Sequence, residues 1–333
     1  MFYAPMPVDG VPEKLFLLHI PDGFLSLLIS IFCWLVTLVV LALAVRRGRE
    51  VFDERLAPLA GVMAAFIFAG QMINFPVAGG TSGHLIGATL AFVVLGPWVG
   101  MLAMTAVIIL QALLFQDGGL VVMGANVLVM GIVPGMVGYG VYQFGKDKGR
   151  GMKTAVIGFG AWLSVIIAAL VTAFLLGFSG TTSLGLAIPA MVGIHTLIGI
   201  GEALITVAAV RFIARIRPGL LQGKESVQGG GWVVGGLLIA LGITLFSPFA
   251  SALPDGLEWV AEKQGFLEAG QSAPFELLPD YTLPFLGETG VSTILAGVVG
   301  VLVVGGITAV LARLLRRQSS MSSVGEWARG DIE

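Results

Sequence analysis

The sequence carries little charge for its length. Of its 333 residues only 11% are Asp, Glu, Lys or Arg, whereas a soluble domain typically has about 25%. Hydrophobic residues make up 56%, and the mean hydropathy is +0.96. The apolar runs of about 17–25 residues are long enough to cross a bilayer core of roughly 30 Å as helices. This composition excludes a soluble globular protein and predicts an all-α, polytopic membrane helical bundle in the cell membrane.

Cysteine and histidine are also scarce. The one cysteine, Cys33, lies in the first apolar run. It has no partner for an internal disulfide, and we interpret it as a small core residue. The chain has three histidines, at positions 19, 84 and 195. Any chemistry that needs imidazole therefore depends on these three side chains.

Several common chemistries lack their sequence patterns. No basic patch suggests a nucleic-acid partner, and no HExxH motif occurs. Residues 140–147 approach a phosphate-binding loop, but Asp147 stands where Ser or Thr is required, and a membrane helix precedes it instead of a strand. We therefore expect this chain not to be an enzyme, to need no organic cofactor and to leave any ATP hydrolysis to partner subunits.

Two short patterns keep a remote enzymatic alternative open. Residues 80–83 and 177–180 fit the GxSG pattern of intramembrane serine proteases, with Ser82 or Ser179 as nucleophile and His195 as base. Such a pattern arises easily in a chain with 48 glycines. Most of these glycines lie inside apolar runs, as at Gly135 and Gly138, where small residues allow close helix packing in lipid.

Nine apolar segments predict about nine transmembrane helices. They cover residues 24–45, 57–73, 84–96, 98–115, 121–143, 153–177, 187–213, 231–250 and 290–314. The third is short and meets the fourth at Gly96-Pro97, so a bent or partly re-entrant hairpin is an alternative to two full spans. Residues 1–17 lack the basic start and apolar core of a usual signal peptide, and we expect the first span to insert as its own uncleaved signal.

The basic residues predict the orientation of the bundle. If the N-terminus is outside, four clusters with 16 of the 18 Lys and Arg face one side. The clusters are Arg46/Arg47/Arg49/Arg55, Lys146/Lys148/Arg150/Lys153, Arg211/Arg215/Arg217/Lys224 and Arg313/Arg316/Arg317/Arg329. The positive-inside rule then gives N-out and C-in. The 74–84 and 251–289 loops are expected on the exterior, together with His19.

Two polar motifs stand out against this apolar background. The segment LHIPDGFLS at residues 18–26 precedes the first span, and GGTSGH at residues 79–84 follows the second. Together they contain two of the three histidines, and both lie on the predicted exterior side. The pattern resembles the substrate-binding membrane component of cobalt and nickel energy-coupling-factor transporters, the CbiM/NikM family. The resemblance implies that the two segments hold one divalent metal ion.

A third motif divides the chain. Residues 218–230 are polar and glycine-rich and are expected to form a cytoplasmic linker. The acidic loop that follows the next span begins SALPDGLEWVA at residues 251–261. It resembles the PDGLE domain, a two-span accessory module of the same transporters. We expect an N-terminal extension at 1–17, the metal-binding unit at 18–217, the accessory module at 231–315 and a cytoplasmic tail at 316–333.

Carried over residue by residue, the resemblance assigns the metal ligands. His19 and His84 supply imidazoles, and Leu18 stands where the family has a ligating amine. Nickel(II) and cobalt(II) favour such nitrogen ligands. The neighbours expected to orient the imidazoles by hydrogen bonds are Asn74, Thr81 and Ser82.

The N-terminus departs from the family pattern, in which the motif stands at the mature N-terminus. Here 17 residues precede Leu18, so no free amine adjoins His19. Three explanations are open: processing before Leu18, initiation at Leu18, or a different donor in place of the amine. We expect the functional chain to begin at Leu18, because an internal amide binds metal only after losing a proton.

Polar residues inside the predicted spans have two interpretations. His195 and Glu202 are seven residues apart and share a helix face, either as a polar lock between helices or as a path for metal passage or coupling. Asn126 is a similar candidate. Met123 and Met130, at helical spacing, are interpreted as packing residues in preference to soft ligands.

The function expected from these patterns is uptake of nickel or cobalt ions from outside. The resemblance implies a membrane coupling subunit, the T component, and two cytoplasmic ATPases as partners. A passive metal channel or a secondary transporter is the alternative. The sequence does not distinguish nickel from cobalt.

Overall fold

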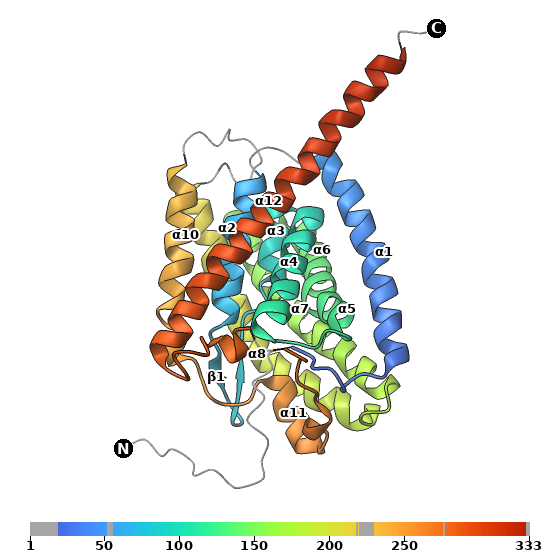
Figure 1. Ribbon diagram of the computed structural model, residues 1–333, viewed down its shortest axis with the longest axis vertical. Coiled ribbons are helices and arrows are strands. Elements are labelled where there is room, and N and C mark those ends of the chain that lie inside the picture. Colours follow the sequence, from blue (N-terminus) through green and yellow to red (C-terminus); the bar gives the residue numbers. More distant parts are fainter. Residues whose placement is uncertain (1–18, 52–55, 218, 220–229, 276, 331–333) are drawn as a thin grey trace.

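The protein is a bundle of helices with one small hairpin at its end (Figure 1). The structure, a computed structural model, describes residues 19–51, 56–217, 219, 230–275 and 277–330, with the backbone alone for 315–330. The expected extension at 1–17, Leu18 and nearly all of the expected linker lie outside the described residues. The predicted all-α membrane bundle is confirmed.

The first part of the chain forms the larger group of helices. They are α1 (Leu27–Val51), α2 (Leu56–Gln71), α3 (Ala88–Leu95), α4 (Pro97–Phe115), α5 (Met123–Asn126), α6 (Val133–Gly145), α7 (Arg150–Phe178) and α8 (Leu184–Ile216). A π-helical turn, Val127–Ile132, joins α5 to α6 into one continuous rod. Between α2 and α3, the strands β1 (Phe75–Val77) and β2 (Thr81–Gly83) pair antiparallel, with Phe75 opposite Gly83.

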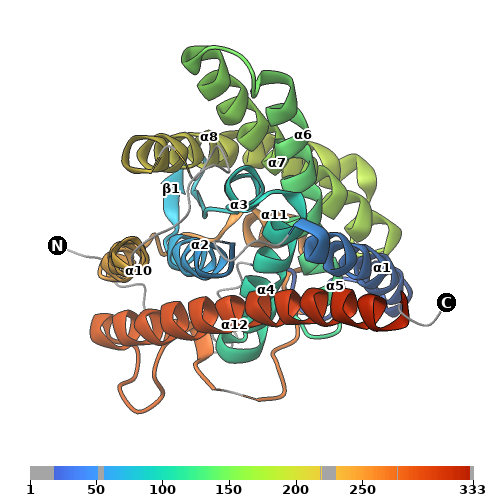
Figure 2. The same ribbon diagram turned by 90° about the horizontal axis from the view of Figure 1, so that it is seen from above.

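The C-terminal part adds two membrane-spanning helices, α10 and α12, and a connecting segment between them that contains a short helix. Its helices are α10 (Gly231–Thr244), α11 (Gly256–Gln264) and α12 (Gly290–Gly330), with short 3₁₀ turns at Ser247–Phe249, Leu267–Ala269 and Pro279–Tyr281. The last helix, α12, continues without a break past the expected boundary at residue 315. Both α10 and α12 pack against α2, so the C-terminal part lies directly on the first part (Figure 2).

Seven helices of the described chain are long and apolar enough to cross a membrane. They are α1, α4, the α5–α6 rod, α7, α8, α10 with the turn that follows it, and α12. The α2 helix is apolar but has 16 residues, and α3 has only eight. The count of nine spans therefore stays a prediction. Seven of the eight residues of α3 are buried, and α3 lies in the middle of the bundle in Figure 2.

The first helix shows how the bundle faces lipid. Leu28, Leu35 and Val39 on α1 are 76%, 60% and 62% exposed. Its buried positions are small or weakly polar: Ser30, Cys33, Thr37, Ala44 and Gly48. Large apolar residues are stable in lipid, so helices associate there through small residues that let backbones approach. The buried position of Cys33 agrees with its interpretation as a core residue.

Candidate metal site

His19 lies just before α1 at the hairpin end of the bundle and is 2% exposed. Its Nδ1 atom is 2.7 Å from Oδ1 of Asp117, in the loop after α4. Gln116, with φ of 56°, ends α4 in the left-handed region and turns the chain toward His19. At Gly118, with φ of 101°, an added Cβ would lie 2.9 Å from Cβ of His19. A side chain at that position would push the histidine away.

Asp117 is placed to accept hydrogen bonds as a carboxylate. Burial alone would raise its pKa, but the interaction with His19 and the hydrogen bonds with His19 and Tyr281 outweigh that effect and hold the pKa of Asp117 below its usual range. A carboxylate that accepts from a histidine ring fixes both the orientation and the tautomer of the ring.

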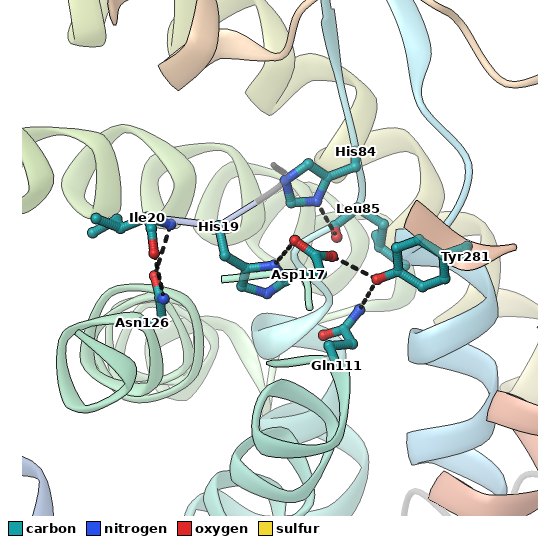
Figure 3. A network of polar contacts seen from close by, with 8 residues as sticks. All are labelled: His19, Ile20, His84, Leu85, Gln111, Asp117, Asn126 and Tyr281. Carbon is teal, nitrogen blue, oxygen red and sulfur yellow. Dashed lines mark hydrogen bonds and ion pairs between the residues drawn. The ribbon is translucent and has the colours of Figure 1, made fainter. Parts of the chain in front are cut away.

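Asn126 holds the backbone beside His19. Its Oδ1 accepts from the N–H of Ile20 and its Nδ2 donates to the carbonyl of Ile20, both at 2.9 Å (Figure 3). This two-point contact joins α5 to the segment that carries the histidine. Asn126 was a candidate for metal passage or coupling, and its hydrogen bonds hold the backbone of Ile20.

Asp22 holds the turn that follows His19 in place through several hydrogen bonds. Its carboxylate accepts from the backbone N–H groups of Leu120, Val121 and Val122, at 3.0, 2.9 and 3.1 Å. Its backbone carbonyl accepts from the N–H of Gln271 in the C-terminal part. The turn after His19 is therefore fastened to two loops that are distant in sequence.

His84 reaches the same place from the hairpin. It follows β2, and its Nδ1 is 3.0 Å from the carbonyl oxygen of Leu85. The rings of His19 and His84 stack with centroids 6.4 Å apart and planes 28° apart. The structure therefore brings together the two histidines that the sequence paired.

Glu202 anchors the chain just after His84. Its two carboxylate oxygens accept from the N–H groups of Ile86 and Gly87, at 2.7 and 3.0 Å. These groups begin α3 and have no partner within the helix. Glu202 is fully buried on α8, so it ties the loop of His84 to a membrane-spanning helix. Of the two interpretations of Glu202, a polar lock between helices or a path for metal, these hydrogen bonds are of the first kind.

All three histidines line one cavity of about 70 Å³. Since water occupies about 30 Å³ in the liquid, there is room for a metal ion with one or two water molecules. His195 donates from Nδ1 to the carbonyl of Met191, at 2.8 Å. Met130 lines the cavity, whereas Met123 is not among its lining residues.

The C-terminal part contributes to the wall of this cavity. Asp255 and Gly256, from the PDGLE motif, are among the lining residues. Asp255 also caps α11, because its side chain accepts from the N–H of Glu258 at 2.7 Å. Burial raises the pKa of Asp255, against that hydrogen bond. An added Cβ on Gly256 would lie 2.7 Å from the ring of His195, so only glycine lets the turn approach so closely.

The residues expected to orient the imidazoles contact the PDGLE turn instead. Thr81 donates from Oγ1 to the carbonyl of Pro254 at 3.0 Å, and the backbone N–H of Ser82 donates to the same carbonyl at 2.8 Å. The carbonyl of Asn74 accepts from the N–H of Ser251 at 2.8 Å. Their observed contacts thus join the hairpin to the accessory module.

The donor set at the cavity is incomplete from side chains alone. Among the described residues, no group of three or more His, Cys, Asp or Glu side chains is arranged as a metal cluster. Further donors would come from backbone nitrogen, from water, or from Leu18, which lies outside the described residues. The His19 Nε2 atom is buried and has no hydrogen-bond partner among the described residues.

Three acids and a tyrosine at this site were not singled out from the sequence as site residues. They are Asp22, Asp117, Asp255 and Tyr281. The available signal was position: Asp22 shortly precedes an apolar span and Asp117 shortly follows one, both at the predicted exterior ends. Acids at such points, on the same side as two histidines, are candidates for second-sphere hydrogen bonding.

Comparison with known proteins identifies the family. Residues 19–220 match the family model CbiM, described as the cobalt uptake substrate-specific transmembrane region. The chain belongs to the CbiM family. Residues 230–317 match the PDGLE domain, so both resemblances inferred from the motifs are confirmed.

Several CbiM-family proteins are similar over long stretches. A putative fused nickel transport protein NikMN of Archaeoglobus fulgidus is 36% identical over 302 residues, which cover 90% of this chain and 99% of that protein. A cobalt transport protein CbiM of Sorangium cellulosum is 32% identical, over 63% of this chain and 97% of that protein. A crystal structure of a truncated transition metal transporter has a TM-score of 0.54 at 35% identity, covering 59% of this chain and 98% of that one.

Proposed function

We propose that this chain is the substrate-binding membrane component of an ATP-driven energy-coupling-factor importer for nickel or cobalt ions. The observation that carries the proposal is the meeting of His19 and His84, from separate motifs, at one cavity. Relatives named as nickel and cobalt transport proteins support it. A coupling subunit and two cytoplasmic ATPases would be the partners, since the chain has no complete phosphate-binding motif.

The site suits a transition-metal cation. Each ring places Nδ1 against an oxygen, of Asp117 for His19 and of Leu85 for His84. Imidazole nitrogen is a good ligand for nickel(II) and cobalt(II). Backbone nitrogen or water would complete the coordination.

The proposed direction is inward from the hairpin end. Basic residues near the C-terminal end of α1, such as Arg47 and Arg49, lie at the opposite end of the bundle from the hairpin (Figure 1). Basic residues tend to stay on the cytoplasmic side. The cavity would then face outward, with Asp255 and Gly256 of the PDGLE motif in its wall.

Uptake in cells tests the proposal. Cells that lack their own nickel and cobalt importers would express the chain with a coupling subunit and two ATPases from one operon. We expect accumulation of nickel or cobalt that needs all partners and falls to background when the ATPases lose their phosphate-binding lysine. Uptake that persists without functional ATPases would contradict an ATP-driven importer and indicate a channel or secondary transporter.

A further inference from the structure

A larger cavity lies at the end of the bundle opposite the hairpin. It has a volume of about 840 Å³ and is formed by the start of α7 and the end of α8. The loop that joins these helices is at the hairpin end, because Oγ1 of Thr181 donates to the carbonyl of Phe24, just after the His19 turn, at 2.5 Å. The cavity is therefore separated from the candidate metal site by the length of both helices.

The cavity forms where α7 and α8 diverge. Farther along the pair, an added Cβ on Gly158 would lie 3.2 Å from Cγ2 of Val207, so the helices are closely packed there. Gly151 lines the cavity, and an added Cβ on it would meet nothing within 4 Å. The space is of the size that small-molecule sites occupy, about 300–1,000 Å³.

Positive charge gathers around this space. Four basic side chains line the cavity: Arg150, Lys153, Arg211 and Arg215. Within the part of the chain that the structure describes, no acidic residue lines the cavity and none of the four forms an ion pair. Lys153 instead lies over the ring of Tyr142, with Nζ 5.5 Å from its centroid, a contact that leaves the charge intact.

The start of α7 adds to this positive field. The helix begins at Arg150, and its first backbone N–H groups have no partner within the helix. Such groups and the helix dipole together attract anions. Since α7 begins at the cavity and basic side chains of α8 line it as well, both helices favour a negatively charged ligand.

The inner wall of the cavity has the opposite character. It is lined by apolar side chains such as Ile157, Val210 and Phe212. Ile157 is seven residues after Arg150, about 10 Å farther along the helix. Phe212 is 50% exposed on a helix long and apolar enough to cross the membrane, so it is open to lipid. A free phosphate matches only the charged end of the cavity, whereas an anion with a hydrocarbon chain matches both ends.

We propose that this cavity binds the headgroup of an anionic phospholipid, with the phosphate among the four basic side chains and an acyl chain along the apolar wall. Basic pockets between membrane helices on the cytoplasmic side suit such headgroups. The proposed orientation of the bundle places the cavity in that leaflet. A bound lipid would bridge α7 and α8 at the end where they diverge. The inference goes beyond the proposed function, since no candidate metal ligand takes part.

Lipid titration of the purified full chain in detergent, followed by native mass spectrometry, tests the proposal. Dioleoyl phosphatidylglycerol and dioleoyl phosphatidylcholine have the same acyl chains, so their comparison isolates the charge. We expect one phosphatidylglycerol to bind per chain in preference to phosphatidylcholine. Arg211→Gln/Arg215→Gln should weaken that binding roughly 25-fold, because each basic residue near an anionic headgroup contributes about 5-fold. Excess inorganic phosphate should not displace the lipid.

Arg46→Gln/Lys146→Gln is the matched control. It removes two exposed charges from the same end of the bundle, outside the cavity, and should keep wild-type lipid binding. Equal phosphatidylglycerol affinity in the two double variants would overturn the proposal, as would displacement of the lipid by phosphate. A cavity variant that keeps the lipid but loses assembly with a partner subunit would also overturn it, in favour of an acidic protein segment. Ni²⁺ binding should be the same in all variants, so failure of the proposed function would show separately.

Discussion

At the scale of single residues, each candidate ligand histidine, or the backbone beside it, is hydrogen-bonded to a side chain that is distant in the sequence. His19 is held by Asp117 through its ring and by Asn126 through its neighbour Ile20. His84 is held by Glu202 through the backbone that follows it. Because each histidine is fixed by a different helix, their separation depends on how α4, α5 and α8 pack.

Glu202 provides the first test at this scale. Glu202→Gln replaces one accepting oxygen by an NH₂ group, so one of the N–H groups of Ile86 and Gly87 loses its partner. We expect the free energy of unfolding to drop by about 1–3 kcal/mol and Ni²⁺ binding to weaken because the loop of His84 loosens. Thermal unfolding in detergent and chelator competition measure the two effects. Normal Ni²⁺ binding with lost uptake would instead favour the passage or coupling role.

The sequence predicted the candidate ligand histidines better than their surroundings. His19 and His84 stood in recognisable motifs, and the structure brings them together as expected. Thr81 and Ser82 were equally visible, but their contacts are with Pro254, about 170 residues away. The hydrogen-bond partner of a hydroxyl depends on the tertiary structure, which sequence spacing alone does not give.

At the scale of elements, the contact between α12 and α2 depends on glycine. At Gly300 an added Cβ would lie 2.1 Å from the ring of Phe68, whereas at Gly306 on the same helix nothing lies within 4 Å. Phe68 also contacts Phe115 and Tyr281. This packing therefore fixes the accessory module where it meets the candidate metal site.

The pair Gly300→Ala and Gly306→Ala tests this contact. Gly300→Ala should destabilise the protein by about 1–3 kcal/mol through overpacking and weaken Ni²⁺ binding, because Tyr281 shifts. Gly306→Ala, with the same change in helix propensity, should leave the melting temperature and binding unchanged or slightly improved. Equal melting temperatures for the two variants would show that α12 does not pack as described.

The helices themselves were largely predictable, because apolar runs reveal membrane-spanning length. The eight-residue α3 was recognised as short, but its burial between other helices was not predicted, since a helix that is apolar on all sides gives no sign of its neighbours. The PDGLE sequence also contained the signal for the start of a helix. Its two acids, Asp255 and Glu258, are three residues apart and form a capping box. That pattern alone would have predicted α11.

At the scale of the whole molecule, two hydrophobic cores meet beside the site. The larger core fills the first helix group and includes residues of α11, and the second joins α2 and α4 to α10 and α12. Tyr281 belongs to the second core and bonds to Asp117 next to the first. Composition and motifs indicated two units along the chain. They did not indicate that the second unit shares a core with α2, because apolar helix faces pack equally well against many partners in lipid.

The central claim is that His19 and His84 together bind one nickel or cobalt ion. Equilibrium binding of Ni²⁺ to purified full-length chain, with the bound metal counted per chain, tests it most directly. The wild type should bind one ion, and His19→Ala and His84→Ala should each lose it while melting as folded proteins. Undiminished stoichiometry and affinity in both histidine variants would contradict the account.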